Sequence, residues 1–273
     1  MAQMLFCCPI CGGKLLESGN RAACQKGHGF DKSKYGYYNL LLSSSGGTHG
    51  DNKDMVLARR AFLASGKYAP LSDALCEFAV RYGGCGARLI DIGCGEGYYT
   101  EQIFRRLSDA GCAAEIAAFD ISKDAVRQLV KKCPEASAAV ASAYQVPALG
   151  ESFDLAVNVF SPFSREEIYR LLKPRGCLIM AIPEENHLFE LKEILYKTPY
   201  KNEPKDPALK GFELIENERV TFKMSLSSKE EIVSLFKMTP YAYRTPREAA
   251  ERLNRLDELT VTADFRLFVY RKI

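Results

Sequence analysis

The sequence predicts an α/β protein with a doubly wound sheet, preceded by a small cysteine-rich module. Two patterns carry this prediction. Short apolar runs alternate with helical periodicity from Arg88 onward, and residue types that bind metal cluster before Phe30. The composition is that of a folded chain, because 47% of the 273 residues are hydrophobic and 26% are charged. A disordered or fibrous protein is therefore excluded.

The chain divides into three parts. Residues 1–45 form the cysteine-rich module, which closes with a flexible Ser/Gly linker at Ser43–Gly47. Residues 46–82 hold the linker and two helices, since apolar residues recur every three to four positions and the pattern breaks near Gly66 and Pro70. Residues 83–273 form the α/β domain.

The α/β domain is expected to contain a mixed seven-stranded sheet with helices on both faces. Apolar runs separated by helical patterns make βαβ units and hence parallel strands, and the last two strands alternate in the antiparallel manner. The expected strands are Arg88–Ile92, Glu115–Phe119, Ala138–Ala141, Phe153–Phe160, Cys177–Ile182, Glu213–Phe222 and Leu259–Tyr270. The expected helices are Tyr98–Leu107, Lys123–Lys132, Arg165–Leu172, His187–Tyr196, Lys229–Lys237 and Pro246–Leu253.

Net charge, apolar stretches and cysteines indicate which partners and which cellular compartment to expect. The net charge of +3 is too small to indicate nucleic-acid binding by itself. A membrane-spanning apolar stretch and a signal peptide are not evident, so we expect a cytoplasmic protein whose ten cysteines are reduced thiols or metal ligands. Outside the module, the expected buried or incidental thiols are Cys76, Cys85, Cys94, Cys112, Cys133 and Cys177.

Cys8, Cys11, Cys24 and His28 have the spacing of a structural zinc site. Two short turns each supply two ligands, which closes a tetrahedral site of three thiolates and one imidazole. A module of this size cannot build an adequate core and needs such a staple. The alternatives are ordinary reduced cysteines in a Gly-rich loop, or Cys7 in place of Cys8 or His28.

A glycine loop follows the first strand of the domain. Asp91 precedes Gly93, Gly95 and Gly97, at the carboxyl edge where doubly wound sheets bind ligands. A dinucleotide is disfavoured, because Tyr98 occupies the place of the third glycine of that fingerprint. Asp120 ends the second strand, where a carboxylate can accept hydrogen bonds from both ribose hydroxyls.

This pattern resembles the S-adenosylmethionine site of class I methyltransferases. The resemblance implies that Gly93–Gly97 lie along the methionine and ribose of the cofactor and that Asp91 supports its ammonium group. It further implies that Asp120 holds the ribose and that Ser142, with Ala143, cradles the adenine. The turn Leu172–Gly176 also resembles the late turn of that family.

Motifs along the whole chain resemble the RlmA-type 23S rRNA (guanine-N1)-methyltransferases. They are the zinc ligands, Gly27–Asp31, Gly36–Leu41, Ala58–Leu63, Asp91–Thr100, His187–Lys192 and Met238–Pro240. The resemblance implies methylation of a guanine in a 23S rRNA hairpin loop, a zinc knuckle that grips RNA, and a homodimer. It also implies cofactor contacts from Tyr68, Gly95, Glu96 and His187. The chain departs from the pattern at Arg175, Asn158 and Phe160–Ser161.

The residues after the fourth expected strand indicate which kind of atom accepts the methyl group. Ser161-Pro162-Phe163 lacks the cysteine nucleophile of cytosine-C5 methylation and the Pro-Pro pair common for exocyclic amines. A ring nitrogen is the simplest remaining acceptor. Guanine N1 carries a proton, so the transfer needs a route for it, and Asp51 is the candidate base.

Basic and aromatic residues near the module could contact RNA. Arg59 and Arg60, with Lys53 and Lys67, form either an RNA-binding edge or a solvated helix face. Tyr35, Tyr37 and Tyr38 either stack on bases or pack the module. Two other functions stay open: a methyltransferase of a small molecule, and a zinc-dependent RNA-binding protein without catalysis.

Overall fold

The computed structural model describes residues 2–42 and 50–273. The first part, called the zinc module below (residues 2–42), contains a four-stranded antiparallel sheet in the order β1-β2-β3-β4. Its strands are β1 (Ala2–Cys7), β2 (Lys14–Ser18), β3 (Arg21–Ala23) and β4 (Gly29–Asp31). The expected linker Ser43–Gly47 lies outside the described residues.

The main sheet has the order β11-β12-β10-β9-β6-β7-β8-β5. Strands β5 to β10 run parallel to one another, whereas β12 pairs antiparallel with both β10 and β11. The strands are β5 (Tyr38–Asn39), β6 (Arg88–Ile92), β7 (Glu115–Asp120), β8 (Ser137–Val140), β9 (Phe153–Val159), β10 (Leu172–Pro183), β11 (Phe212–Leu226) and β12 (Leu259–Lys272). The mixed α/β sheet is thus confirmed, with one strand more than the seven expected.

The eighth strand, β5, comes from the zinc module. Tyr38 and Asn39 pair with Ala139 and Val140 at the edge of the sheet. No sequence pattern indicated this strand, because two residues are too few for a visible alternation of apolar and polar positions. The main sheet therefore takes its last strand from the first 45 residues of the chain.

Nine helices occur in the described residues, and four of them begin with a side-chain cap. Asn52, Ser122, Ser164 and Ser228 each accept a hydrogen bond from a backbone amide in the first turn of their helix. The helices are α1 (Lys53–Ala64), α2 (Ala69–Gly83), α3 (Tyr98–Asp109), α4 (Lys123–Lys132), α5 (Arg165–Leu171), α6 (Phe189–Leu195), α7 (Lys229–Lys237), α8 (Tyr241–Arg244) and α9 (Arg247–Leu253). The four-residue α8 was not expected from the sequence.

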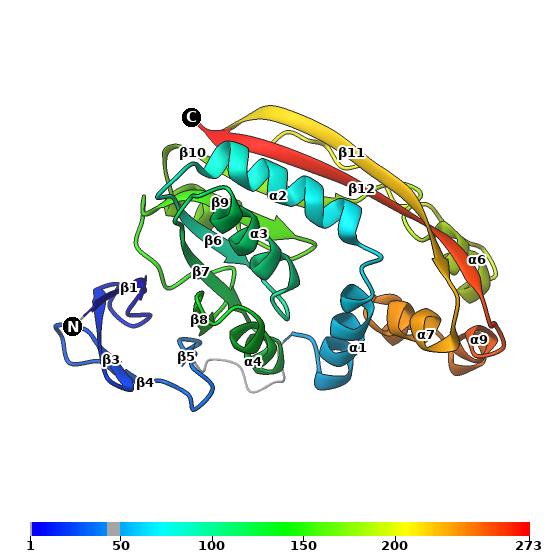
Figure 1. The fold of residues 1–273 in the computed structure, drawn as a ribbon, viewed down its shortest axis with the longest axis horizontal. Helices are drawn as coiled ribbons and strands as arrows, with labels where there is room; N and C mark the ends of the chain where they lie inside the picture. Colours follow the sequence, from blue (N-terminus) through cyan, green and yellow to red (C-terminus); the bar gives the residue numbers. More distant parts are fainter. Residues whose placement is uncertain (1, 43–49) are drawn as a thin grey trace.

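Alternate residues of the strands point into two separate cores. On β6, Leu89 joins the core under α2, α3 and α4, whereas Ile90 and Ile92 join the other core. The second core contains residues of α5 and of the zinc module, including Phe6 and Leu15. Figure 1 shows α2, α3 and α4 along one side of the sheet and the zinc module beside β8 and β5.

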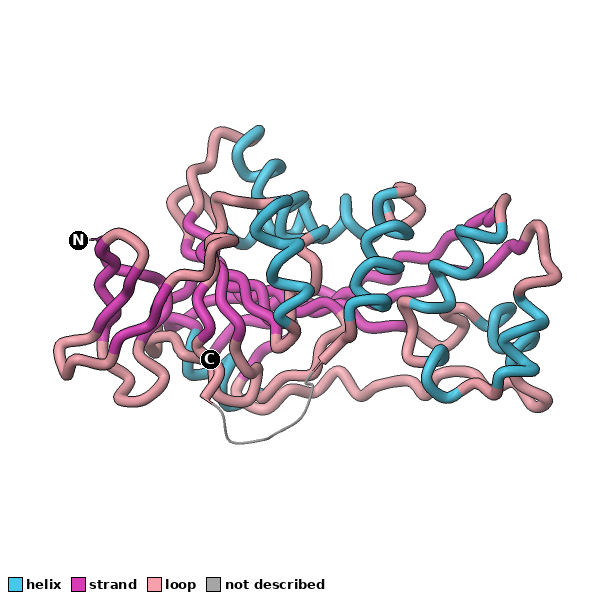
Figure 2. Tube along the Cα trace, turned by 90° about the horizontal axis from the view of Figure 1, so that it is seen from below, coloured by secondary structure: helices cyan, strands magenta, loops and turns pink. Residues whose placement is uncertain are grey.

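The long antiparallel pair β11 and β12 extends beyond the parallel strands and carries the C-terminal helices at its far end. Figure 2 shows the four-stranded module at one end of the molecule and these helices at the other. Helix α7 packs against α1, and α9 packs against both α6 and α7. Among the described residues, none of the helices has the length and apolar character needed to cross a membrane.

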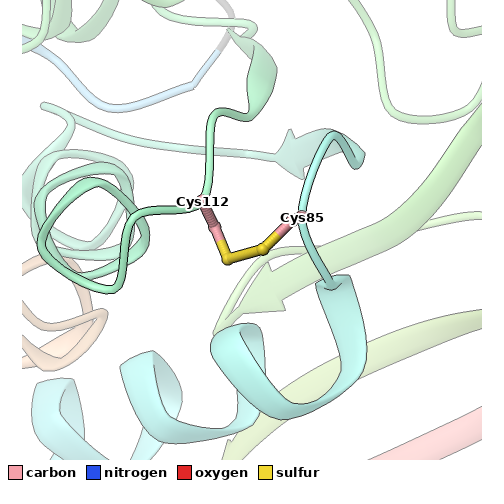
Figure 3. The surroundings of a disulfide bond; sticks show 2 residues. All are labelled: Cys85 and Cys112. Carbon is pink, nitrogen blue, oxygen red and sulfur yellow. A yellow bond between two sulfur atoms is a disulfide. The ribbon is translucent and has the colours of Figure 1, made fainter.

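Two cysteines form a disulfide that the sequence analysis did not anticipate. Cys85 follows α2 and Cys112 follows α3, and their Cα atoms lie 4.4 Å apart (Figure 3). The expectation that both are separate thiols is wrong. Both helices are followed by neighbouring parallel strands, β6 and β7, so the two turns lie side by side at the same edge of the sheet.

Candidate active site and metal centre

The four expected zinc ligands converge in the zinc module. The ligand atoms of Cys8, Cys11, Cys24 and His28 all lie within 4.8 Å of one another. The Cys11 and Cys24 sulfurs are 3.7 Å apart, and His28 Nδ1 lies 3.5 Å from the Cys8 sulfur and 3.4 Å from that of Cys24. A tetrahedral zinc with ordinary bond lengths requires about 3.7 Å between sulfurs and about 3.5 Å from sulfur to nitrogen. The donor set therefore fits zinc.

Two tight turns present these ligands. The Gly12 amide donates to the Cys8 carbonyl and the Gly27 amide to the Cys24 carbonyl, with φ values of +70° and +83° at the two glycines. Only glycine adopts this conformation without strain. Cys7 is not part of the cluster: it ends β1, and its amide donates to Pro147 O at 2.7 Å.

The glycine loop (Gly93–Gly97) has the shape of a ligand cradle. All three glycines have positive φ. A Cβ atom at Gly93 would collide with Ser161, and one at Gly97 would collide with Leu129, so protein fills those two places. A Cβ atom at Gly95 would meet only the Arg59 guanidinium, at 3.7 Å, so the side of Gly95 stays open to a ligand.

Two carboxylates support this loop in different ways. Asp91 Oδ2 accepts a hydrogen bond from Thr100 Oγ1 at 2.5 Å, and burial raises the pKa of the Asp91 carboxyl to about 7. Asp120 ends β7 and accepts hydrogen bonds from the amides of Gly95 and Ser122, at 3.0 and 2.8 Å. Asp120 therefore lies beside the open side of the loop, as a ribose ligand must.

Glu96 is buried at the start of α3. One carboxylate oxygen pairs with Lys132 Nζ at 2.6 Å. In the described part of the chain, the other oxygen is buried without a hydrogen-bond partner. A buried orphan acceptor within the loop is consistent with a ligand that donates a hydrogen bond there.

Tyr68 and His187 lie together in what we call the aromatic cluster, formed by Tyr68, Phe160, His187 and Phe265. The Phe265 ring centroid is 5.1 Å from that of Tyr68, 4.6 Å from that of His187 and 5.3 Å from that of Phe160. Burial lowers the pKa of His187 to about 3, so its ring is neutral at physiological pH. His187 Nδ1 accepts a hydrogen bond from the amide of Asp264 at 3.3 Å, which leaves the ring proton on Nε2.

Asp51, just before α1, lies beside Ser122, which follows the end of β7. The Asp51 carbonyl accepts a hydrogen bond from Ser122 Oγ at 2.7 Å, and the Asp51 carboxylate forms an ion pair with Arg59. Arg59 also donates to Met238 O at 3.3 Å. Arg60, by contrast, is exposed and donates to Gln128 Oε1 at 2.9 Å. The two adjacent arginines thus have different surroundings.

Ser142 follows β8 and lines a groove between the zinc module and the main sheet. The groove has a volume of about 740 Å³ and is also lined by Pro9, Ile10, Ile121 and Tyr144. Ser142 Oγ accepts a hydrogen bond from the amide of Tyr144 at 3.2 Å. The expected adenine-side residue therefore lies where the groove meets the cofactor side.

The aromatic residues of the zinc module divide between packing and exposure. Tyr37 and Tyr38 are buried, and Tyr38 Oη donates to Glu17 at 3.0 Å. Tyr35 is exposed, and the Arg127 guanidinium lies 5.0 Å from its ring centroid. Tyr38 therefore packs in the core that the module shares with the sheet, whereas Tyr37 packs in the opposite core under α2, α3 and α4. Of the three tyrosines, only Tyr35 is accessible.

Sequence reasoning missed two residues of this site. Thr100, the hydrogen-bond partner of Asp91, is buried on the first turn of α3, and a threonine in a helix gives no signal of its own. Phe160 is 42% exposed and has a φ of +59°, which the sequence cannot reveal. In the sequence, Phe160 stands at the end of an expected strand and was noted only as a departure from the family pattern.

An open glycine cradle with a carboxylate at the end of the neighbouring strand defines a class I S-adenosylmethionine-dependent methyltransferase. The methyltransferase domain family matches residues 89–176, and the RlmA N-terminal zinc ribbon family matches residues 6–43. A relative from Micromonospora griseorubida, provisionally assigned as a 23S rRNA (guanine-N1)-methyltransferase, is 33% identical, and the match covers 97% of both chains. The chain therefore belongs to the 23S rRNA (guanine-N1)-methyltransferase family.

Two further comparisons agree with this assignment. The 23S rRNA (guanine(748)-N(1))-methyltransferase of Streptomyces fradiae is 39% identical over 191 residues, which span 69% of this chain and 66% of that protein. A Bacillus halodurans structure provisionally assigned as a methyltransferase superposes with a TM-score of 0.50 at 16% identity and supports the fold alone. It covers 74% of this chain and 98% of that one. The protein is thus an enzyme that uses S-adenosylmethionine and carries a zinc ribbon.

Proposed function

We propose that the enzyme transfers a methyl group from S-adenosylmethionine to N1 of a guanine in a hairpin loop of 23S rRNA. The observation that carries this proposal is the groove between the zinc module and the main sheet, because its lining runs from Pro9 and Ile10 of the module to Ile121 and Ser142, which follow β7 and β8 at the edge where we place the cofactor. The names of the relatives from Streptomyces fradiae and Micromonospora griseorubida support the same substrate.

The residues of the glycine loop and its neighbours contact different parts of the cofactor. Asp120 binds the ribose, and the open side of Gly95 allows a ligand to approach the backbone closely. Gly93 and Gly97 let the loop pack against Ser161 and Leu129, and Asp91 stiffens the loop through Thr100. Glu96, Ser142, Tyr68 and His187 complete the cofactor contacts. When bound, the sulfonium supplies an activated methyl group.

The chemistry at the acceptor is a single displacement. The bond between N1 and the methyl carbon forms as the sulfur–carbon bond breaks, and the N1 proton leaves to a base or to water. Asp51 is our candidate for that base. Its carboxylate pairs with Arg59 beside the glycine loop, so an Asp51→Asn variant with an unchanged pH–rate profile would remove it from consideration.

RNA contacts are proposed on both sides of the cofactor. Arg60 is exposed on α1 and can reach a phosphate, whereas Arg59 is held by Asp51 near the glycine loop and is not expected to neutralise one. On the other side, Ile10 and Tyr144 are exposed at the groove and offer surfaces for unstacked bases.

We further propose that the enzyme acts in rRNA processing in the cytoplasm as a homodimer. The cytoplasmic location follows from the proposed substrate, and the dimer follows from the family resemblance. Light scattering coupled to size exclusion measures the mass in solution, and a mass near that of one chain would refute the dimer.

The decisive test is nucleoside mass spectrometry of rRNA from a strain that lacks this gene. We expect loss of 1-methylguanosine from 23S rRNA and its return on complementation. Transfer assays should also favour an unpaired loop over the same sequence locked in a duplex, because N1 is covered by base pairing. Unchanged rRNA nucleosides would favour the small-molecule alternative instead.

A further inference from the structure

Phe160 has a backbone conformation that a phenylalanine adopts only at a cost. Its φ is +59°, in the left-handed region that favours glycine, and its amide donates to Ala181 O at 3.1 Å. Non-glycine residues in this region are strained and concentrate at functional sites. In addition, Phe160 leaves 42% of its surface exposed, so burial does not offset the strain in full.

Buried aromatic residues support the Phe160 ring from one side. The ring tilts by 33° against that of Phe265, which is fully buried. Phe265 in turn packs against His187 and Tyr68, the two residues that we assign to the cofactor. Phe160 is thus the exposed end of the aromatic cluster, anchored through Phe265 in the core.

The neighbours of Phe160 fix it beside the glycine loop. Asn158 Nδ2 donates to Ile92 O at 3.2 Å, which ties the end of β9 to the end of β6. Ser161 follows, and its hydroxyl oxygen lies 1.8 Å from the position that a Cβ atom at Gly93 would take. Phe160 therefore lies between two residues that contact the strand and loop where the methyl donor binds.

We propose that Phe160 stacks on the target guanine after the base has left its helical stack, and so positions N1 toward the methyl group. This inference rests on the proposed function. A flat, exposed ring beside the methyl donor meets the need of an enzyme that must hold an unstacked base, because every base offers a π-face. Phe160 is then a substrate-binding residue and not a cofactor ligand.

Substitution of Phe160 tests this role. Phe160→Gly removes the ring and also relieves the left-handed backbone, so it should fold at least as readily as Phe160→Leu. We expect kcat/KM for the rRNA hairpin to fall about 5- to 150-fold in Phe160→Gly, as for loss of one stacked base. Phe160→Tyr should restore the rate, and the affinity for S-adenosylmethionine should stay unchanged in calorimetry.

A matched control distinguishes the effect of losing the Phe160 ring from the effect of relieving backbone strain. Arg175 is also exposed with a left-handed φ of +66°, and Arg175→Gly should relieve the same strain without affecting transfer. A second readout is binding to the hairpin whose target guanine is replaced by an abasic sugar. Phe160→Gly should weaken binding of the intact hairpin but not of the abasic one.

Each outcome has one meaning. Wild-type transfer by Phe160→Gly, or equal weakening on both hairpins, would overturn the stacking role while leaving the proposed function intact. If the wild-type enzyme methylates no guanine in the 23S rRNA hairpin, the proposed function itself fails.

Discussion

The two faces of the main sheet are covered in different ways. One face lies under α2, α3 and α4, whose residues Leu71, Leu107 and Leu129 are buried against it. The other face is covered by α5 and by the zinc module, which contributes Phe6, Leu15 and Leu40. The module is also bound through backbone pairing, because β5 extends the sheet and Phe6 bridges to Ala148.

This difference predicts that one face of the catalytic sheet depends on a metal. A helix satisfies its own backbone hydrogen bonds. A module of about 40 residues, by contrast, has too small a hydrophobic core to fold stably unless a bound metal or another cross-link holds it together. The zinc ligands Cys8 and Cys24 belong to the same buried core as Ile90 and Ala117 of the sheet. We therefore expect zinc to stabilise the methyltransferase sheet as well as the module.

The largest expected effect comes from loss of zinc. Cys24→Ser or chelation should unfold the module, because a structural zinc contributes about 10–16 kcal/mol of apparent binding energy. Hydrogen exchange should accelerate in β1 to β5 and in β8, with less change in α3. Elemental analysis should give about one zinc per chain before treatment.

The neighbouring residue Cys7 provides the control for this experiment. Cys7 is buried but lies outside the ligand cluster, so Cys7→Ser should retain zinc. A metal-free protein whose module exchanges as slowly as that of the zinc-bound form would show that the second face does not depend on the metal.

Two leucines test whether the faces unfold together. Leu15 in the module and Leu129 on α4 are both fully buried, in opposite cores. If the chain unfolds as one unit, Leu15→Ala and Leu129→Ala should each lower the free energy of unfolding by about 2–5 kcal/mol. Urea titration with zinc present measures both. A separate early transition in Leu15→Ala alone would mean that the module unfolds independently of the sheet.

The comparison also shows how far the sequence determines the structure. Local signals were sufficient on the helix-covered face: the helical pattern predicted Lys123–Lys132 at the bounds observed for α4, and in the structure Ser122 caps this helix. The zinc ligands and the glycine loop were also predictable, because their chemistry needs fixed spacings along the chain. These features could be predicted because they depend on residues that lie close together in the sequence.

Long-range contacts could not be predicted. The pairing of Tyr38 with Ala139, the Cys85–Cys112 disulfide and the approach of Arg59 to Gly95 each join distant segments, and no local pattern encodes them. The left-handed φ of Phe160 could not be predicted from the sequence either, because phenylalanine rarely adopts this conformation. The missed features therefore lie where tertiary packing outweighs local preference.

Asp120 tests the cofactor site at the edge shared by both faces. Asp120→Ala should weaken S-adenosylmethionine binding by about 1.5–3 kcal/mol, the range for hydrogen bonds to a charged group. Asp124→Ala is a suitable control, because that carboxylate pairs with Arg127 on α4 at 3.2 Å. Calorimetry that gives the same affinity for Asp120→Ala and the wild type would show that Asp120 does not hold the ribose.

The smallest effect separates the two arginines of α1 and tests whether the RNA path reaches the helix-covered side of the molecule. If both side chains neutralised phosphates, the double Ala variant would flatten the slope of log affinity against log salt by about 1.4–1.8. Because Arg59 pairs with Asp51 beside Gly95, we expect only Arg60→Ala to flatten it, by about 0.7–0.9. Arg59→Ala should instead lower cofactor affinity more than Arg60→Ala does. An unaltered salt slope in Arg60→Ala would confine the RNA path to the side of the zinc module.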